Sequence, residues 1–99
     1  MKANLSIQIL PGVQDDREVT RIVDEVIDYI RSTGLHYYVG PSDTAIEGDD
    51  LHQLMEIAEN CMQVAARAGS EKTSAYMKLI WRPEGKVLTI DEKVVRHHQ

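Results

Sequence analysis

The chain has 99 residues, of which 42% are hydrophobic and 27% are charged, and its formal net charge is -5. This length predicts one domain over residues 1–99, and the composition is typical of a folded globular domain. The 11 basic residues are scattered along an acidic chain, which argues against nucleic acid as a partner. No apolar run is long enough to cross a membrane and no signal-peptide pattern opens the sequence. We therefore expect no membrane partner and a cytoplasmic location.

The first two predicted elements are a strand and a helix. Apolar and polar residues alternate over residues 3–10, which predicts a half-buried strand that Pro11-Gly12 ends. Asp15 with Glu18 resembles a capping box, and Gly34 suits the end of the helix. The apolar positions of this helix recur at 3.6-residue spacing and predict one buried face: Val19, Ile22, Val23, Val26, Ile27 and Ile30.

The middle of the chain predicts a hairpin and a second helix. Two short β-rich runs between residues 36 and 48 flank Gly40-Pro41-Ser42-Asp43, a turn sequence. Asp49 can cap a helix that ends at Gly69. Its inward stripe is predicted to contain Leu51, Leu54, Met55, Ala58, Cys61, Met62, Ala65 and Ala68. The lone cysteine excludes an intramolecular disulfide and a cysteine-based zinc site, and it is expected in the core.

The last predicted strand covers residues 73–81, with Met77, Leu79 and Trp81 facing the helices. In the tail, residues 82–99, a turn precedes a possible edge strand over residues 86–90. Thr89 and Glu92 then resemble a capping box. The tail can cover its own sheet edge or dock on a neighbouring subunit, and the residues leave both alternatives open. His97 and His98 are adjacent at the chain end and are expected to be solvated rather than metal ligands.

The order β-α-β-β-α-β predicts an α+β, ferredoxin-like split βαβ fold, with an antiparallel sheet, both helices on one face and an extra C-terminal strand or helical turn. The other face of the sheet stays open. Strand alternation assigns seven residues to this open face: Ser6, Gln8, His36, Tyr38, Glu47, Tyr76 and Lys78. A solvated face seldom needs two central tyrosines, so a ligand or a partner is expected to cover it.

Three functions fit this surface. A small-molecule binding protein would use the aromatic and polar groups as a site, whereas a structural or regulatory oligomer would use Tyr38 and Tyr76 as interface anchors. A small acid-base enzyme could use His36, Tyr38 and Glu47. The sequence contains no phosphate-binding glycine loop, no metal-ligand motif and no nucleophile beside a base. We therefore expect no enzyme, no metal and no cofactor.

Several short motifs carry a resemblance to a known family. They are Ser6 in the first strand, Gly34-Leu35-x-Tyr37, Pro41, Thr44-x-Ile46-Glu47-Gly48-Asp49, Ala68-Gly69, Lys78 and Asp91-Glu92-Lys93-Val94. With these motifs the chain resembles the small thiamine-binding-protein-like family, the YkoF type. The resemblance implies a ferredoxin-like domain that forms homodimers or homotetramers through its sheets. It also implies binding of thiamine or of its hydroxymethylpyrimidine part, although this chain carries one copy of a domain that the better understood thiamine binders duplicate.

The resemblance and the open face together predict a ligand set. Glu47 would accept from the amino group or face the cation, Tyr38 or Tyr76 would stack, and small polar groups would fix the ring edges. Thr44 has helix-side parity, so its inclusion rests on the motif and needs a local bulge. Lys78 would pair with Glu47 or bind a phosphate. The predicted ligand-binding residues are Ser6, Gln8, Tyr38, Thr44, Glu47, Tyr76 and Lys78.

Overall fold

The computed structural model describes residues 1–97 and contains the predicted succession of strands and helices. The elements are β1 (Ala3–Pro11), α1 (Asp16–Ser32), β2 (Tyr37–Val39), β3 (Thr44–Gly48), α2 (Leu51–Arg67), β4 (Thr73–Trp81), α3 (Ile90–Val94) and the 3-10 helix η1 (Val95–His97). The four strands form one antiparallel sheet in the order β2-β3-β1-β4. The fold is therefore the predicted ferredoxin-like α+β arrangement. His98 and Gln99 lie outside the described residues, and so does the prediction made for His98.

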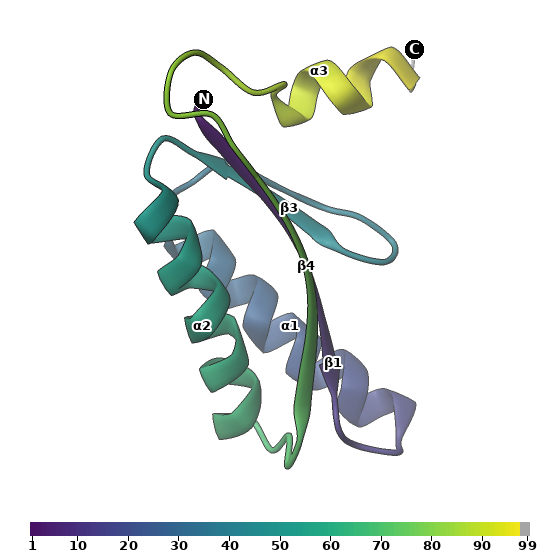
Figure 1. Ribbon diagram of the computed structural model, residues 1–99. Helices are drawn as coiled ribbons and strands as arrows, with labels where there is room; N and C mark the ends of the chain where they lie inside the picture. Colours follow the sequence, from purple (N-terminus) through teal and green to yellow (C-terminus); the bar gives the residue numbers. More distant parts are fainter. Residues whose placement is uncertain (98–99) are drawn as a thin grey trace.

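The two long helices and the short one lie on opposite sides of the sheet. In Figure 1, α2 lies on one side of the strands, and α3 lies on the other side near the N-terminus. The helix-facing side of β1 packs against α1 and α2, since Leu5, Ile22 and Leu54 are almost fully buried together. Within residues 1–97, no helix has both the length and the apolar character that a membrane crossing requires.

The inward stripe of α2 differs slightly from the predicted one. Ile57 was not predicted to face inward but is buried, whereas Met55 was predicted inward and is 49% exposed. The buried residues recur with helical periodicity and define one helix face: Leu54, Ile57, Ala58, Cys61 and Ala65. Met55 is adjacent to Leu54 in the sequence and lies outside that buried face.

Two predicted helix caps are also corrected. Asp15 caps α1, but its carboxylate accepts from the Arg17 amide, and Glu18 pairs with Arg21 at 2.7 Å instead of completing a capping box. The residue that caps α2 is Asp50 rather than Asp49. Asp49 accepts from the Lys2 amide of the first strand end instead. Glu18 and Asp49 thus bond to other donors than the predicted ones.

Two backbone hydrogen bonds show toward which neighbouring strand the N–H and C=O groups of each residue point. The Arg82 amide donates to the Lys2 carbonyl (2.9 Å), and the Glu47 amide donates to the His36 carbonyl (3.1 Å). Peptide groups alternate in direction along an antiparallel strand. With the observed registers, even-numbered residues of β1 therefore bond β4 and odd-numbered residues bond β3. On β4, the odd-numbered residues point their N–H and C=O groups away from the sheet.

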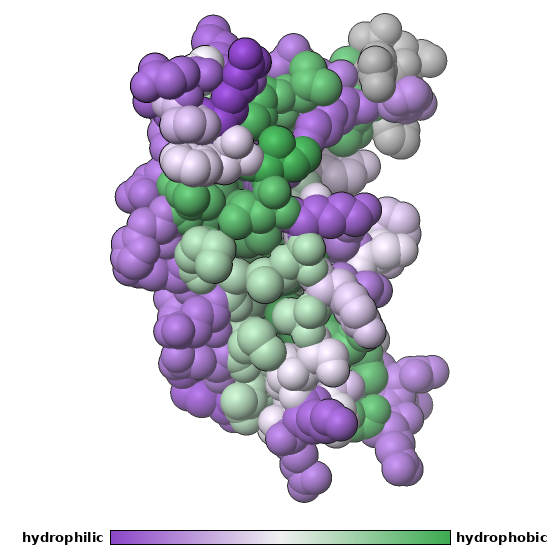
Figure 2. All heavy atoms as spheres, in the orientation of Figure 1, coloured by the Kyte–Doolittle hydropathy of each residue, from purple (hydrophilic) through white to green (hydrophobic). Residues whose placement is uncertain are grey.

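Strand β4 has the predicted orientation but not the predicted burial. Met77, Leu79 and Trp81 face the helix side, yet they are 49%, 39% and 50% exposed. The helices pack over β1 and β3 and leave the outer flank of β4 open. Figure 2 shows hydrophobic atoms in a band along the middle of the face seen in Figure 1, with hydrophilic atoms on both sides. The predicted strand over residues 86–90 is absent from the described chain. The Val87 amide makes one hydrogen bond to the Met1 carbonyl, and the tail then turns into α3.

Candidate functional site

Most of the predicted ligand residues lie in adjacent rows on the open face of the sheet. One row crosses all four strands, from Tyr38 on β2 through Ala45 and Ser6 to Lys78 on β4. The next row pairs Gln8 with Tyr76. Tyr38 is 41% and Tyr76 is 65% exposed, and Lys78 is exposed too. This aromatic and polar surface is open to solvent and can be covered by a large partner more readily than it can enclose a small ring.

Glu47 occupies a different environment from the one predicted. It faces the same side as Tyr38 and Lys78, but it is only 5% exposed, and its Oε2 atom accepts from the Ile90 amide at 2.8 Å. Ile90 is the first residue of α3, so the carboxylate satisfies an otherwise unpaired amide at a helix start. The expected ion pair between Glu47 and Lys78 is not formed among the described residues. In this structure Glu47 therefore holds the tail through the Ile90 amide.

The start of α3 carries the capping box that the sequence predicts. The Glu92 amide donates to the Thr89 hydroxyl (3.1 Å), and the Thr89 amide donates to the Glu92 carboxylate (3.0 Å). These bonds, first of all the backbone donation from Thr89, lower the pKa of the Glu92 carboxyl. His36 approaches Asp91 of α3 at 3.3 Å. Two acidic side chains, Glu47 and Asp91, thus join the tail to the rest of the domain, while Glu92 caps the helix within the tail.

Thr44 lies on the helix side of the sheet, as its parity indicates, and not with the open-face residues. It is 7% exposed and lies at the start of β3, opposite Ile7 of β1. There it lines a slot between α1 and the tip of the β2–β3 hairpin, with a cavity volume of about 240 Å³. Of the predicted ligand residues, Gln8 and Thr44 line this slot, and no bulge is needed to bring Thr44 there.

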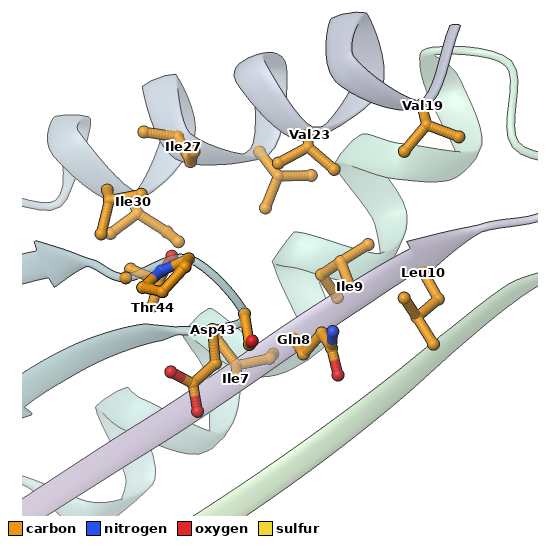
Figure 3. A pocket seen from close by; sticks show the side chains of 15 residues that line it. Ile7, Gln8, Ile9, Leu10, Val19, Val23, Ile27, Ile30, Asp43 and Thr44 are labelled. Atoms are coloured by element: carbon orange, nitrogen blue, oxygen red, sulfur yellow. The ribbon is translucent and has the colours of Figure 1, made fainter. Parts of the chain in front are cut away.

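The walls of the slot come from three elements. In Figure 3, the valines and isoleucines of α1 project toward β1, whose Ile7 and Ile9 lie below them, while Asp43 and Thr44 lie where the hairpin ends. The hairpin tip is held by donation from the Gly40 amide to the Asp43 carbonyl at 2.8 Å. The result is an apolar slot with one carboxylate among its lining residues.

The backbone of β1 contributes polar groups to this slot. The ladder between β1 and β3 ends at the pair Ile7–Thr44, whereas β1 continues to Pro11. Odd-numbered residues of β1 point toward β3, so the N–H and C=O groups of Ile9 face a place where no strand lies opposite. One donor and one acceptor are therefore presented side by side, next to apolar side chains. The signal in the sequence for this slot was the length of the first predicted strand, residues 3–10, which exceeds that of the short β-rich runs of the hairpin.

The one cysteine of the chain takes no part in either surface. Cys61 is buried in α2 and burial raises the pKa of its thiol to about 12. At neutral pH it is protonated and poorly nucleophilic. It is thus the core residue that the sequence predicts.

Comparison with known proteins identifies relatives over nearly the whole chain. Residues 5–98 match the family model of the thiamine-binding proteins. A UPF0045 protein of Clostridium perfringens is 37% identical over 94 residues, which cover 95% of each chain. A Bacillus cereus domain of unknown function superposes with a TM-score of 0.84 at 30% identity, covering 98% of this chain and 90% of the other. A candidate thiamine biosynthesis or salvage protein of Thermotoga maritima gives a TM-score of 0.82 at 28% identity, covering 98% and 99%.

Proposed function

Because this chain belongs to the family of thiamine-binding proteins, we propose that it binds thiamine or its hydroxymethylpyrimidine part as a small-molecule binding protein without chemistry of its own. We place the pyrimidine ring in the slot between α1 and the hairpin tip. The observation that carries this proposal is that the N–H and C=O groups of Ile9 face an apolar slot, on the side of β1 where no strand is paired with Ile9. We further propose that the protein acts in the cytoplasm, where the Cys61 thiol stays reduced.

The chemistry of an aminopyrimidine matches the Ile9 backbone. The ring carries an amino group, which donates, next to a ring nitrogen, which accepts. An extended residue with a free edge offers the reverse pair, since its C=O accepts and its N–H donates. The side chains of Ile7, Ile9 and Val23 would cover the two faces of the flat ring. Thr44 and Asp43 supply further polar groups at the hairpin end.

The size and charge of the slot favour one ring over the complete two-ring ligand. Its volume of about 240 Å³ lies below the usual range of ligand pockets, about 300–1,000 Å³. In thiamine, the cationic thiazolium would then lie toward the mouth of the slot, near the Asp43 carboxylate. Lys78 lies on the opposite face of the sheet, so its positive charge does not oppose this placement. The net charge of -5 favours a cationic ligand as well.

We also propose that the protein self-associates into a homodimer or homotetramer through the open face of the sheet. Tyr38, Tyr76 and Ile80 are exposed at 41%, 65% and 51% on this face. Tyrosine is a frequent anchor residue of protein interfaces. An oligomer without any small ligand is the alternative function that the exposed tyrosines favour.

Ligand binding is tested by thermal unfolding and titration calorimetry with hydroxymethylpyrimidine, thiamine and thiamine phosphates. A ligand that prefers the native state raises the melting midpoint. Val23→Trp fills the slot and is expected to weaken binding at least tenfold, whereas Ala66→Trp, on the exposed side of α2, leaves affinity unchanged. Removal of the hairpin carboxylate in Asp43→Asn should weaken thiamine more than the neutral pyrimidine.

Two outcomes contradict the slot. Unchanged affinity in Val23→Trp would exclude it, and so would a loss of affinity in Tyr76→Ala, which would return the ligand to the open face. If none of the ligands raises the midpoint, the oligomer without a ligand becomes the better function.

A further inference from the structure

We propose that a second pocket, between the end of β4 and the tail, binds a small anion with a flat aromatic body, either an aryl phosphate or an aromatic carboxylate. This tail pocket has a volume of about 320 Å³ and shares no lining residue with the slot between α1 and the hairpin tip. Its lining consists of four apolar and three basic residues: Ile80, Trp81, Val87 and Leu88, and Arg82, Lys86 and Lys93. The proposal does not depend on the ligand of the slot.

The tail pocket is built where the chain leaves β4 and turns toward α3. The Arg82 amide donates to the Lys2 carbonyl (2.9 Å), and the Val87 amide donates to the Met1 carbonyl (2.9 Å). Both ends of the turn over residues 82–87 are thus tied to the start of the chain, and Figure 1 shows this loop close to the N-terminus. Because these bonds hold the backbone of the turn, less ordering is required when a ligand binds.

A glycine lets the Arg82 side chain lie over this turn. Gly85 has a φ of +111°, and a Cβ atom built there would lie 3.1 Å from Arg82 Nε. The Arg82 Nη1 atom donates to the Lys86 carbonyl at 3.4 Å. The guanidinium is thus held at the tail pocket by a long bond to a neutral acceptor, which leaves its charge available to an anion.

The three basic residues of the tail pocket form no ion pair within residues 1–97, whereas Arg21 and Arg31 of α1 do. No lining residue of the pocket is acidic. The bonds with Thr89 lower the pKa of the Glu92 carboxyl, and the charge of Lys86 adds to this effect, but that carboxylate already accepts from the Thr89 amide. The tail pocket therefore concentrates positive charge on a chain with a net charge of -5, and this charge favours an anion as its ligand.

The apolar part of the lining selects the body of the ligand. Ile80, Trp81 and Leu88 are 51%, 50% and 59% exposed. A flat ring would remove part of this apolar surface from water, which a bare phosphate cannot do. Its π-system would also attract the nearby cations. A ligand that combines a ring with a negative charge therefore uses both halves of the lining.

Tryptophan fluorescence tests the binding, because Trp81 is the only tryptophan of the chain. Titration with phenyl phosphate should change the Trp81 emission to saturation, with a dissociation constant of at most about 1 mM that calorimetry reproduces. Benzyl alcohol has a ring without a charge, and inorganic phosphate has a charge without a ring. Each of the two should bind at least tenfold more weakly. Titration with benzoate then shows whether the pocket prefers the phosphate or the carboxylate.

Substitutions locate the anion. Lys86→Gln combined with Lys93→Gln should weaken phenyl phosphate binding at least tenfold. Arg67→Gln combined with Lys72→Gln removes the same charge from exposed positions before the other end of β4 and should leave the affinity unchanged. Leu88→Asn, at an exposed apolar wall, should weaken phenyl phosphate but not inorganic phosphate. Circular dichroism and the melting profile verify that the variants fold.

Four results overturn the proposal. The first two are the absence of heat and of any emission change with phenyl phosphate at millimolar concentration, and equal affinity for benzyl alcohol. The third is unchanged affinity in the folded variant that lacks the Lys86 and Lys93 charges. The fourth is loss of phenyl phosphate binding in Val23→Trp, measured by calorimetry, because this result would place the anion in the slot.

Discussion

Strands β1 and β4 are neighbours of equal length, nine residues each, and both alternate apolar and polar residues over much of their length. On β1, the helix-side residues Leu5 and Ile7 are 1% and 2% exposed. On β4, the paired residues Leu79 and Met77 are 39% and 49% exposed. Alternation therefore tells which face a side chain lies on. Whether that face is buried depends on the helices that cover it, and on β4 they leave the side chains partly exposed.

The largest expected difference between the two strands is in the free energy of unfolding that is lost when a leucine is shortened to alanine. Leu5→Ala should lower the free energy of unfolding by roughly 2–5 kcal/mol, the range for a buried leucine. Leu79→Ala, its cross-strand partner, should cost less than about 1.5 kcal/mol in the monomer, because part of the side chain is already in water. Urea denaturation at low protein concentration gives both values. Equal losses would mean that β4 is covered as well as β1.

The attachment of α3 to β3 gives the next largest effect. Glu47→Ala leaves the Ile90 amide without its charged acceptor and should destabilise the protein by roughly 1.5–3 kcal/mol. Asp43→Ala, a carboxylate at the other end of β3, is the control and should have a smaller effect on unfolding. Faster hydrogen exchange over residues 89–95 in Glu47→Ala would locate the change in the tail. Unchanged exchange there would show that the carboxylate does not hold α3.

A smaller effect is expected from the capping box of α3. Thr89→Ala removes the hydroxyl that accepts from the Glu92 amide and should lower stability by about 0.5–2 kcal/mol. Thr20→Ala is the matched control and should change stability little. The Thr20 hydroxyl donates to the Asp16 carbonyl on the exposed side of α1. Thermal unfolding of both variants makes the comparison. A larger loss in Thr20→Ala would contradict the role assigned to the cap.

The smallest expected effect on stability at neutral pH comes from the buried thiol of Cys61. Burial raises the pKa of Cys61 from 9.0 to about 12, so the folded state keeps a proton that the unfolded state loses. Stability from this group is complete below pH 9 and is lost as the pH rises toward 12. Cys61→Val should flatten the fall in unfolding free energy between pH 9 and 11. An identical slope in both proteins would show that the thiol does not contribute.

The fold was predictable because its signals are local. Thr89 and Glu92 are three residues apart and form the predicted box. Even so, the Glu18 carboxylate accepts from the Arg21 guanidinium, three residues along α1, and not from the Asp15 amide that the predicted capping box requires. Local spacing defines which bonds are possible, and competition among near neighbours decides between them.

The candidate site was less predictable because it depends on contacts between distant segments. Alternation placed Glu47 on the open face correctly. Nothing near Glu47 in the sequence indicates that Ile90, 43 positions later, contacts its carboxylate. The slot arises because α1 spans the gap left where β3 is shorter than β1. Such an arrangement needs the relative placement of three elements, which no single stretch of sequence specifies.

The unpartnered amide of Asn4 has a consequence for the motion of the tail. Asn4 is the cross-strand neighbour of Glu47 on the open face, is 3% exposed, and its Nδ2 atom is buried without a hydrogen-bond partner among the described residues. Leaving such a donor unpaired costs about 1–3 kcal/mol. Water regains this donor whenever α3 lifts away, so the docked state is stabilised by less than the Glu47 contact alone provides. Amide exchange of Ile90 should therefore be faster than its hydrogen bond to Glu47 alone would suggest.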